Sequence, residues 1–331
     1  MKRMVALAVA SFVLLVTGAK AEVSEIVITR GDGVGFLPLN IMEKQKLVEK
    51  HAEQAGVKLS VKWVNISGSG VVNDALLSGS AHFISGGPPG MLTLWDKTKG
   101  KMDVRGIGAI SAQPMYLNTR APHLKSIDDI TPNDKIAVTG VKISIPSIIM
   151  QMYARKKFGE AETFRFDPMT VAFKHPDGVA ALLSGSVGVT AHYTSPPFHQ
   201  KERTDPSVRT IMTSNDVMGG TTTFAMMVAT EKFQRENPKV VLAVAGALEE
   251  AQQAIEKDKT IAVESLLETL GRGWDEKELR AVLNDPDIKF PFVPHNVKTY
   301  ADFMADIGSI KNRPASWKDI FFEHVHSRPG S

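Results

Sequence analysis

Apolar and polar residues alternate along the first part of the chain with two different periods. Residues 25–29 form a short apolar run, and residues 57–63 are apolar at every second position, so both segments are predicted to be strands. Residues 39–54 are apolar on one side at helical spacing and precede Gly56, which predicts a single helix. The same patterns continue with a helix, a strand and a helix at 71–78, 81–85 and 91–97. This alternation predicts an α/β fold with a mostly parallel sheet and helices on both faces.

A second α/β segment follows the first. Residues 135–139 are predicted to be a strand, and residues 145–158 a helix with Pro146 in its first turn and a serine available as its cap. Two more strands are predicted at 187–192 and 224–229. The remainder of the chain is expected to be helical, at 231–236, 238–257, 261–270, 277–284 and 297–307.

A six-residue segment, Ala-Leu-Leu-Ser-Gly-Ser, occurs twice, at 75–80 and at 181–186. Each copy leads through a predicted strand to a Pro-Pro pair, at 88–89 and at 196–197. A helix end, a glycine cap and a strand are common in α/β proteins, so the match could be accidental. The matching loops downstream favour two structurally similar lobes instead.

The helical tail contains too few strands for a third sheet, and we expect it to pack around the first lobe. The first lobe is then discontinuous, with residues 22–115 and 220–331, and the second lobe is residues 116–219. The chain would cross between lobes near 111–121 and near 213–223. Two crossings between two lobes are expected to act as a two-segment hinge.

The N-terminal segment is interpreted as a signal peptide, residues 1–21. Lys2 and Arg3 precede an apolar run, and Ala19-Lys20-Ala21 supplies the small-x-small pattern of a cleavage site. A membrane anchor is the alternative, but the apolar run is short against the ~20 residues that a spanning helix needs. The mature chain is therefore expected to begin at Glu22 and to reside in the periplasm.

The amino-acid composition argues against several classes of function. The 331 residues include 39 Lys and Arg, 36 Asp and Glu, and no Cys. The absence of cysteine excludes disulfides, thiolate nucleophiles and Cys-ligated metal sites. No basic cluster with interleaved aromatic residues indicates a nucleic-acid surface. No nucleophile elbow, zinc motif or dinucleotide fingerprint occurs, and His324 and His326 form only a weak pair in the tail. We therefore expect no enzymatic activity, no metal and no cofactor.

Three loops of the first lobe directly follow predicted strands, at residues 31–36, 67–70 and 86–90. Ligands of open α/β sheets bind at the carboxyl ends of strands, where helix N-termini present unpaired N–H groups and partial positive charge. The loop 67–70 is the strongest candidate, because its hydroxyls and amides could converge on a carboxylate or sulfonate. Each loop alone is better explained as a plain helix cap, so the hypothesis rests on all three meeting at one edge.

The matching positions of the second lobe are 141–147 and 190–195. His192 and Tyr193 could supply directional hydrogen bonds and an aromatic wall, although a structural pair explains them equally well. The hydroxyls of 221–223 lie at the second crossing, where a plain strand is the favoured interpretation. Arg30 and Lys142 are the obvious cations of these segments. An organic ligand with one acidic head and an apolar or aromatic body is therefore favoured over a bare inorganic anion.

These residues resemble periplasmic substrate-binding proteins of ABC importers, and most closely their nitrate/sulfonate/taurine group, which also contains thiamine-precursor binders. The resemblance is carried by the leader, by Phe36-Leu37-Pro38-Leu39, by the repeated Leu-Ser-Gly-Ser units, by Gly86-Gly87-Pro88-Pro89 and by residues 190–198, Thr-Ala-His-Tyr-Thr-Ser-Pro-Pro-Phe. It implies a type II two-lobed periplasmic-binding-protein-like fold with the ligand cleft between the lobes. By position, the cleft contacts of the family would fall on Gly35, Phe36, Ser67, Gly68, Ser69, Gly87, Pro88, Ser144, Ser147, His192, Tyr193, Thr194 and Thr222.

The resemblance implies a solute receptor that delivers a small ligand to an ABC permease in the inner membrane. We expect the receptor to be a monomer and the ligand to be sulfonate-like, carboxylate-like or aromatic. Related enzymes on this scaffold use cysteines, namely a desulfinase and the fungal pyrimidine-precursor synthases, and this chain has none. Two alternatives stay open. One is a cofactor-free enzyme that uses His192 as a general base, and the other is a sensor that presents its ligand to a membrane receptor.

Overall fold

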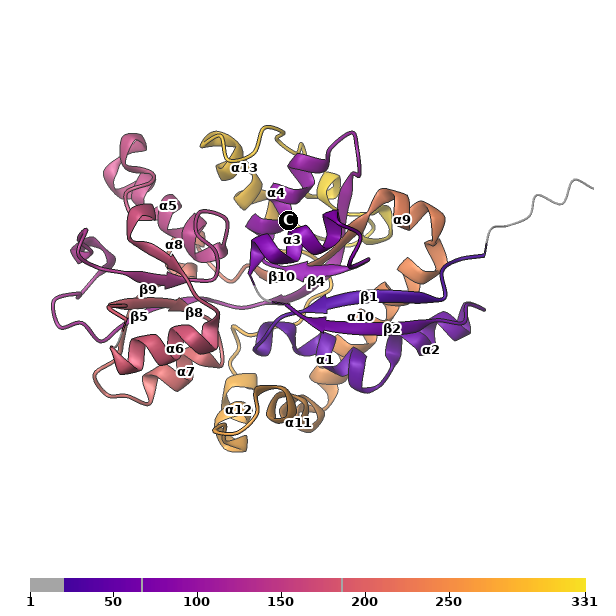
Figure 1. Cartoon of the computed structure of the whole chain (residues 1–331), viewed down its shortest axis with the longest axis horizontal. Helices are drawn as coiled ribbons and strands as arrows, with labels where there is room; N and C mark the ends of the chain where they lie inside the picture. Colours follow the sequence, from indigo (N-terminus) through magenta and orange to yellow (C-terminus); the bar gives the residue numbers. More distant parts are fainter. Residues whose placement is uncertain (1–20, 67, 186) are drawn as a thin grey trace, which may run out of the picture.

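The computed structural model describes residues 21–66, 68–185 and 187–331 of the chain. These residues form two lobes that lie side by side, as Figure 1 shows. Residues 1–20 of the predicted signal peptide, Ser67 of the predicted site and Ser186 of the repeat lie outside the described residues. Within the described part, no helix combines the length and the apolar character needed to cross a membrane.

The first lobe contains two groups of strands. In one, β1 (Glu25–Arg30) and β2 (Ser60–Asn65) pair in parallel. In the other, β10 (Thr223–Thr230) lies between β3 (Ile84–Gly86) and β4 (Val104–Ala112) and is antiparallel to both. A parallel bridge from Ile28 of β1 to Phe83, next to β3, joins the two groups.

The second lobe has one five-stranded sheet in the order β7-β6-β8-β5-β9. Its central strand β8 (Ala191–Thr194) is parallel to β6 (Ile136–Val138) and antiparallel to β5 (Tyr116–Thr119). The outer strands are β7 (Thr170–Ala172), parallel to β6, and β9 (Arg209–Thr213), antiparallel to β5.

The prediction of a mostly parallel sheet holds, because in each lobe a single strand runs antiparallel to its neighbours. The antiparallel strands are β5 and β10, which are the first strands that the chain forms after each crossing between lobes. The first crossing runs from β4 to β5 through residues 113–115. The second runs from α8 (Ser214–Met218) to β10 through residues 219–222, which include Gly219 and Gly220 at positive φ.

The predicted single helix 39–54 is wrong. The chain forms α1 (Leu37–Lys44) and then α2 (Leu47–Gln54), and the break lies at Gln45 and Lys46. Lys46 has φ 50° and ψ 42°, a left-handed conformation that a continuous α-helix cannot contain. Both helices still bury one apolar face, and this shared face is the pattern that suggested one helix.

The bounds of other helices agree better with those predicted from the sequence. The main difference is that some of the helices begin earlier than predicted. The helix α5 (Ile145–Phe158) has the predicted bounds, with Ser144 as its N-cap. The helices α3 (Ser69–Leu77) and α4 (Pro88–Thr98) begin earlier than predicted. Prolines are tolerated in a first helical turn because the N–H that they lack would have no partner there. The loop predicted at 86–90 is thus partly the start of α4.

The repeated segment forms the same series of elements twice. The first copy ends α3 and leads through β3 to α4. The second ends α6 (His175–Ser184) and leads through β8 to α7 (Phe198–Arg203). Gly79 and Gly185 follow these helices at φ 76° and φ 66°. The strand predicted at 187–192 begins only at Ala191, and β4, β5, β7 and β9 were not predicted.

Helices of the C-terminal tail pack on strands and helices of the N-terminal part of the chain. Figure 1 shows α10 behind the β1–β2 pair, and Gln252 of α10 donates from Nε2 to the carbonyl oxygens of Ala109 at 2.9 Å and Ile110 at 3.0 Å in β4. The tail helices are α9 (Glu231–Glu236), α10 (Pro238–Lys257), α11 (Lys259–Leu270), α12 (Glu276–Leu283) and α13 (Val297–Asp306).

Candidate ligand-binding site

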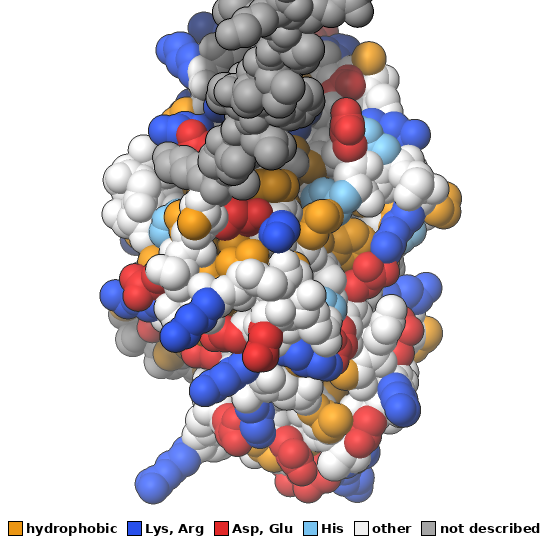
Figure 2. All heavy atoms as spheres, turned by 90° about the vertical axis from the view of Figure 1, so that its right-hand side faces the viewer, with side chains coloured by type: hydrophobic (Ala, Val, Ile, Leu, Met, Phe, Trp, Pro, Cys, Tyr) orange, Lys and Arg blue, Asp and Glu red, His pale blue; other side chains and the backbone are white. Residues whose placement is uncertain are grey.

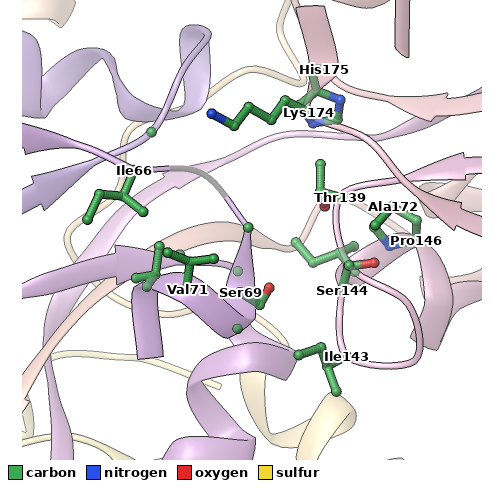
Figure 3. A pocket seen from close by; sticks show the side chains of 18 of the residues that line it. Ile66, Ser69, Val71, Thr139, Ile143, Ser144, Pro146, Ala172, Lys174 and His175 are labelled. Carbon is green, nitrogen blue, oxygen red and sulfur yellow. The ribbon is translucent and has the colours of Figure 1, made fainter. Parts of the chain in front are cut away.

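A cavity of about 460 Å³ lies between the two lobes. In Figure 3, Ile66, Ser69 and Val71 of the first lobe face Thr139, Ser144 and Ala172 of the second across it, with Lys174 and His175 at one rim. The lining segments follow strands β1, β2 and β3 in one lobe and β6 and β7 in the other. They are residues 31–36, 66–72, 85–91, 139–146 and 172–175, together with Met115 and Phe224, although not every residue in these ranges lines the cavity.

Four of the helices begin at this cavity, namely α3, α4, α5 and α6. Their N-cap residues, Gly68, Gly87, Ser144 and Lys174, all line it. The first N–H groups of a helix have no intrahelical acceptor, and the N-terminus carries a partial positive charge. Four such ends around one volume create a positive potential there without needing many cationic side chains.

The α3 end has the most backbone donors to offer. The helices α4, α5 and α6 carry proline in their first two positions, whereas α3 does not. The N–H groups of Ser69, Gly70 and Val71 therefore precede the first bond of α3, from the N–H of Val72 to the carbonyl oxygen of Gly68 at 3.2 Å. Gly68 has φ 102°, a conformation that favours glycine and that turns the chain from β2 into this helix.

Most of the lining side chains are apolar. Phe36 and Phe224 meet edge to face with centroids 5.9 Å apart, and Met91 and Met115 also line the cavity. The charged side chains on the lining are Asp32 and Lys174. Such a surface suits a ligand with a small acidic group and an apolar body.

The two cations named from the sequence, Arg30 and Lys142, do not line the cavity. The guanidinium Nε of Arg30 pairs with Oε2 of Glu43 at 2.8 Å and does not line the cavity. Lys142 lines a separate pocket, with Gln151 and Asp167. Lys174, which the sequence analysis did not single out, is the cationic side chain on the lining.

Five of the predicted site residues lie on the cavity and most of the others do not. Those on the lining are Phe36, Gly68, Ser69, Gly87 and Ser144. Ser67 lies outside the described residues. Those away from the lining are Gly35, Pro88, Ser147, His192, Tyr193, Thr194 and Thr222.

The predicted site residues away from the lining have other structural contacts. Gly35 packs under the ring of Phe224, where a Cβ would lie 2.2 Å from Cδ1. Pro88 is buried at the start of α4. Ser147 donates from Oγ to the carbonyl oxygen of Gly140 at 3.0 Å and so holds the loop before α5. Thr222 bonds to the hydroxyl of Tyr300 at 3.1 Å.

His192, Tyr193 and Thr194 are buried in the central strand of the second lobe, with none of their surface exposed. His192 Nδ1 lies 2.5 Å from Oε1 of the equally buried Glu202. A general base must come within hydrogen-bond distance of the proton that it removes. In this structure His175, and not His192, reaches the cavity wall.

His175 was missed by sequence reasoning. Its Nδ1 lies 3.4 Å from His192 Nε2 and 3.4 Å from Thr194 Oγ1, and its ring stacks on Phe198. Burial, and then the neighbouring His192, hold the pKa of His175 well below its usual range. The only signal was its place before Pro176, a typical helix start, but α6 itself was not predicted.

Outside the cavity, we searched the described residues for metal sites and for charged surface patches. In the part of the chain that the structure describes, no group of three or more His, Asp and Glu residues could hold a metal ion. On the face shown in Figure 2, Lys and Arg side chains lie among Asp and Glu side chains. This mixture agrees with the nearly balanced charge of the sequence.

Comparison of the sequence with protein-family models and with curated proteins found no match. Comparison of the structure found many solved structures with the same fold. The alkanesulfonate-binding protein SsuA from Xanthomonas axonopodis pv. citri, bound to MOPS, has a TM-score of 0.68 at 15% identity, over 88% of this chain and 96% of that one. The periplasmic aliphatic sulphonate binding protein SsuA from Escherichia coli has a TM-score of 0.65 at 16% identity, over 91% and 93%.

The periplasmic nitrate-binding protein NrtA from Synechocystis PCC 6803 has a TM-score of 0.69 at 14% identity, over 92% of this chain and 88% of that one. These likenesses extend over both lobes and over nearly the full length of the solved chains. Identities this low carry information about the fold alone. The chain has the two-lobed fold of the periplasmic binding proteins, as its sequence predicted.

Proposed function

We propose that this protein is the solute-binding component of an ABC import system and that it captures a small organic anion in the interlobe cavity. The observation that carries the proposal is the convergence of four helix N-termini on one apolar cavity between two lobes. The sulfonate-binding and nitrate-binding neighbours have this fold and bind anions, which supports the proposal.

The proposed pose puts the acidic group at the N-terminus of α3 and the body of the ligand against the apolar wall. Ser69 would donate from its backbone N–H and its hydroxyl, and Ser144 would contribute from the opposite lobe. Phe36 and Phe224 would pack on the body. A volume of about 460 Å³ is far larger than nitrate needs, so the larger organic anions are favoured.

We further propose that ligand binding favours a closed arrangement of the lobes 22–115 plus 220–331 and 116–219. The N–H of Val34 in the first lobe donates to the carbonyl oxygen of Pro196 in the second at 3.3 Å. A ligand that touches both α3 and α5 would add contacts that exist only when the lobes are close. The closed form is then the one that the permease would receive, with the protein acting as a periplasmic monomer after removal of residues 1–21.

Thermal unfolding with a panel of sulfonates, carboxylates, nitrate and aromatic acids tests the proposal. The protein is produced with its own leader and purified from cells, and its N-terminus is sequenced, with Glu22 expected. A ligand at a hundred times its dissociation constant should stabilise the folded state by about 2.7 kcal/mol. Recovery of the ligand unchanged after prolonged incubation separates binding from turnover. Failure of every organic anion in the panel would count against the proposed ligand class.

A further inference from the structure

A chain of buried polar side chains leads from the interior of the second lobe to the cavity wall. It begins at Glu202 on α7, passes through His192 on β8 and ends at His175, the first residue of α6. Glu202 and His192 have no exposed surface, and His175 is 9% exposed and lines the cavity. Figure 3 shows His175 beside Lys174 at the rim of the cavity.

The carboxylate of Glu202, at the acidic end of this row of side chains, accepts hydrogen bonds. Asn118 donates from Nδ2 to Oε2 of Glu202 at 2.7 Å, and Thr210 fixes that amide by donating to its Oδ1 at 2.8 Å. The other carboxylate oxygen, Oε1, lies 2.5 Å from Nδ1 of His192. A buried carboxylate is costly unless its oxygens accept hydrogen bonds. His192 must therefore carry its hydrogen on Nδ1.

The tautomer of His192 determines which ring nitrogen of His175 carries a hydrogen. An imidazole ring that carries its only hydrogen on Nδ1 presents a lone pair at Nε2. In His192 that atom faces Nδ1 of His175 at 3.4 Å, and two lone pairs at this distance would repel each other. His175 is therefore expected to hold its hydrogen on Nδ1 as well, directed at His192.

The remaining nitrogen of His175 is then a fixed acceptor. Its Nε2 makes no hydrogen bond with any residue in the described part of the chain. Stacking on Phe198, with centroids 5.4 Å apart and planes 25° apart, restrains the ring. Burial and His192 keep His175 neutral by lowering its pKa, so the lone pair persists at physiological pH.

We propose that His175 is a specificity-determining residue that selects, among organic anions, those with an N–H or O–H group on the body of the molecule. This group would donate to Nε2 of His175 while the acidic group occupies the helix N-termini. Glu202 and His192 are positioning residues that fix the tautomer. The inference rests on the proposed function, since it assumes that a solute binds in the interlobe cavity.

The tautomer can be tested without any ligand. Nitrogen-15 NMR of the whole protein, labelled at histidine, distinguishes protonated from unprotonated ring nitrogens, and His175→Gln and His192→Gln assign the signals. We expect both rings to be protonated at Nδ1 and unprotonated at Nε2. In Glu202→Gln the constraint is lost, and an Nε2–H form of His175 should appear. A wild-type His175 that carries its hydrogen on Nε2 would overturn the inference.

The selection is tested with matched probes by calorimetry, namely benzoate against 4-hydroxybenzoate and benzenesulfonate against 4-aminobenzenesulfonate. The wild type should prefer the hydroxyl or amino member of each pair by roughly tenfold, as one hydrogen bond to a buried acceptor allows. His175→Phe keeps an aromatic ring but loses the acceptor, so the ratio of the two affinities within each pair should fall to about one, whatever the change in absolute affinity. His51→Phe, on α2 far from the cavity, serves as the control and should retain the preference.

The outcomes separate the two hypotheses. Equal binding of both members of each pair by the wild type, or a preference that survives in His175→Phe, contradicts the role of His175 alone. Binding of none of the four probes counts against the proposed function, whereas the NMR result on the tautomer stands independently of it.

Discussion

Gly87 of the first lobe and Ile145 of the second face each other across the cavity, and a Cβ on Gly87 would lie 3.2 Å from both Cδ1 and Cγ1 of Ile145. A Cβ at this position would require Ile145 or the lobes to shift by a few tenths of an ångström, and a larger side chain would require more. Gly87 has φ −68° and ψ 146°, which any residue can adopt, so the requirement here is space and not backbone conformation.

Gly87→Val should therefore keep the lobes apart and weaken ligand binding. We expect a loss of at least tenfold in affinity, measured by calorimetry with the best ligand of the panel, and little change in the unfolding midpoint of the unliganded protein. Shortening the opposing side chain in Gly87→Val/Ile145→Ala should restore part of the affinity. Equal affinities for wild type and Gly87→Val would show that this contact does not limit closure.

Ser69 lies where the acidic group of the ligand is proposed to bind, as the first residue of α3. Ser69→Asp would place a negative charge there, and two like charges about 4 Å apart at an effective dielectric constant near 20 repel by about 4 kcal/mol. We expect a loss of at least a hundredfold in affinity for an anionic ligand. An acidic residue is favourable at a helix N-terminus, so the fold should remain intact.

Ser69→Asn is the matched control, because asparagine has the size of aspartate without its charge. It should bind the same ligand within about tenfold of the wild type, as expected for the loss of one hydrogen bond. Calorimetry on the two variants separates charge from size. If both bind equally, the acidic group of the ligand lies elsewhere in the cavity.

The sequence predicted the two-lobed fold and the sheet edge at which the cavity lies, but not which residues of the second lobe line the cavity. Glycines and serines after strands identified Gly68, Ser69 and Ser144, because helix starts are encoded locally. His192 and Tyr193 were equally local signals, yet their strand lies in the centre of the sheet and buries both side chains. Which face of a short strand is covered depends on helices packed from elsewhere, which no local pattern records.

The break between α1 and α2 is another feature that the apolar pattern did not show. One apolar face continues through residues 39–54, and the pattern does not show that Lys46 adopts a left-handed conformation. His175 was missed because α6 is short and begins next to a proline, and its importance comes from Glu202, which lies on a different helix. For His175, contacts between residues distant in sequence decided the position.

His199 offers a test of pH dependence. It stacks on Tyr116 with centroids 3.7 Å apart, and burial lowers its pKa from 6.5 to about 4. The unfolded chain then binds more protons than the folded one between these two values. Stability should fall as the pH is lowered from about 6.5, with a contribution from this group of about 1.4 kcal/mol per pH unit.

His199→Phe keeps an aromatic ring against Tyr116 and removes the titrating group. Urea unfolding between pH 7 and pH 4.5 should show a shallower decline in the free energy of unfolding for this variant. His175, whose pKa burial also lowers, contributes to the same decline in both proteins and leaves a residual slope. Parallel curves for wild type and variant would mean that His199 does not titrate in this range.

The loop between α11 and α12 makes a second contact between the lobes, away from the cavity lining. Lys201 of α7 donates from Nζ to the carbonyl oxygen of Gly273 at 2.9 Å and lies 5.7 Å from the ring of Trp274, which also meets Phe198. Because Phe198 stacks on His175, this contact connects the outer surface to the cavity wall. Lys201→Met should remove the hydrogen bond and the charge while retaining the length of the side chain.

An exposed interaction of this kind contributes only about 0.5–1 kcal/mol, so global stability should change little. If the contact forms only when the lobes are closed, its loss shifts the population toward the open form and weakens ligand binding by roughly twofold to fivefold. Small-angle scattering of the unliganded protein should then show a larger radius of gyration than the wild type, while the liganded forms agree. Lys239→Met, on α10 in the first lobe, controls for the loss of one positive charge. Identical scattering and affinity for the two variants would mean that the contact between Lys201 and the α11–α12 loop persists in the open form and takes no part in closure.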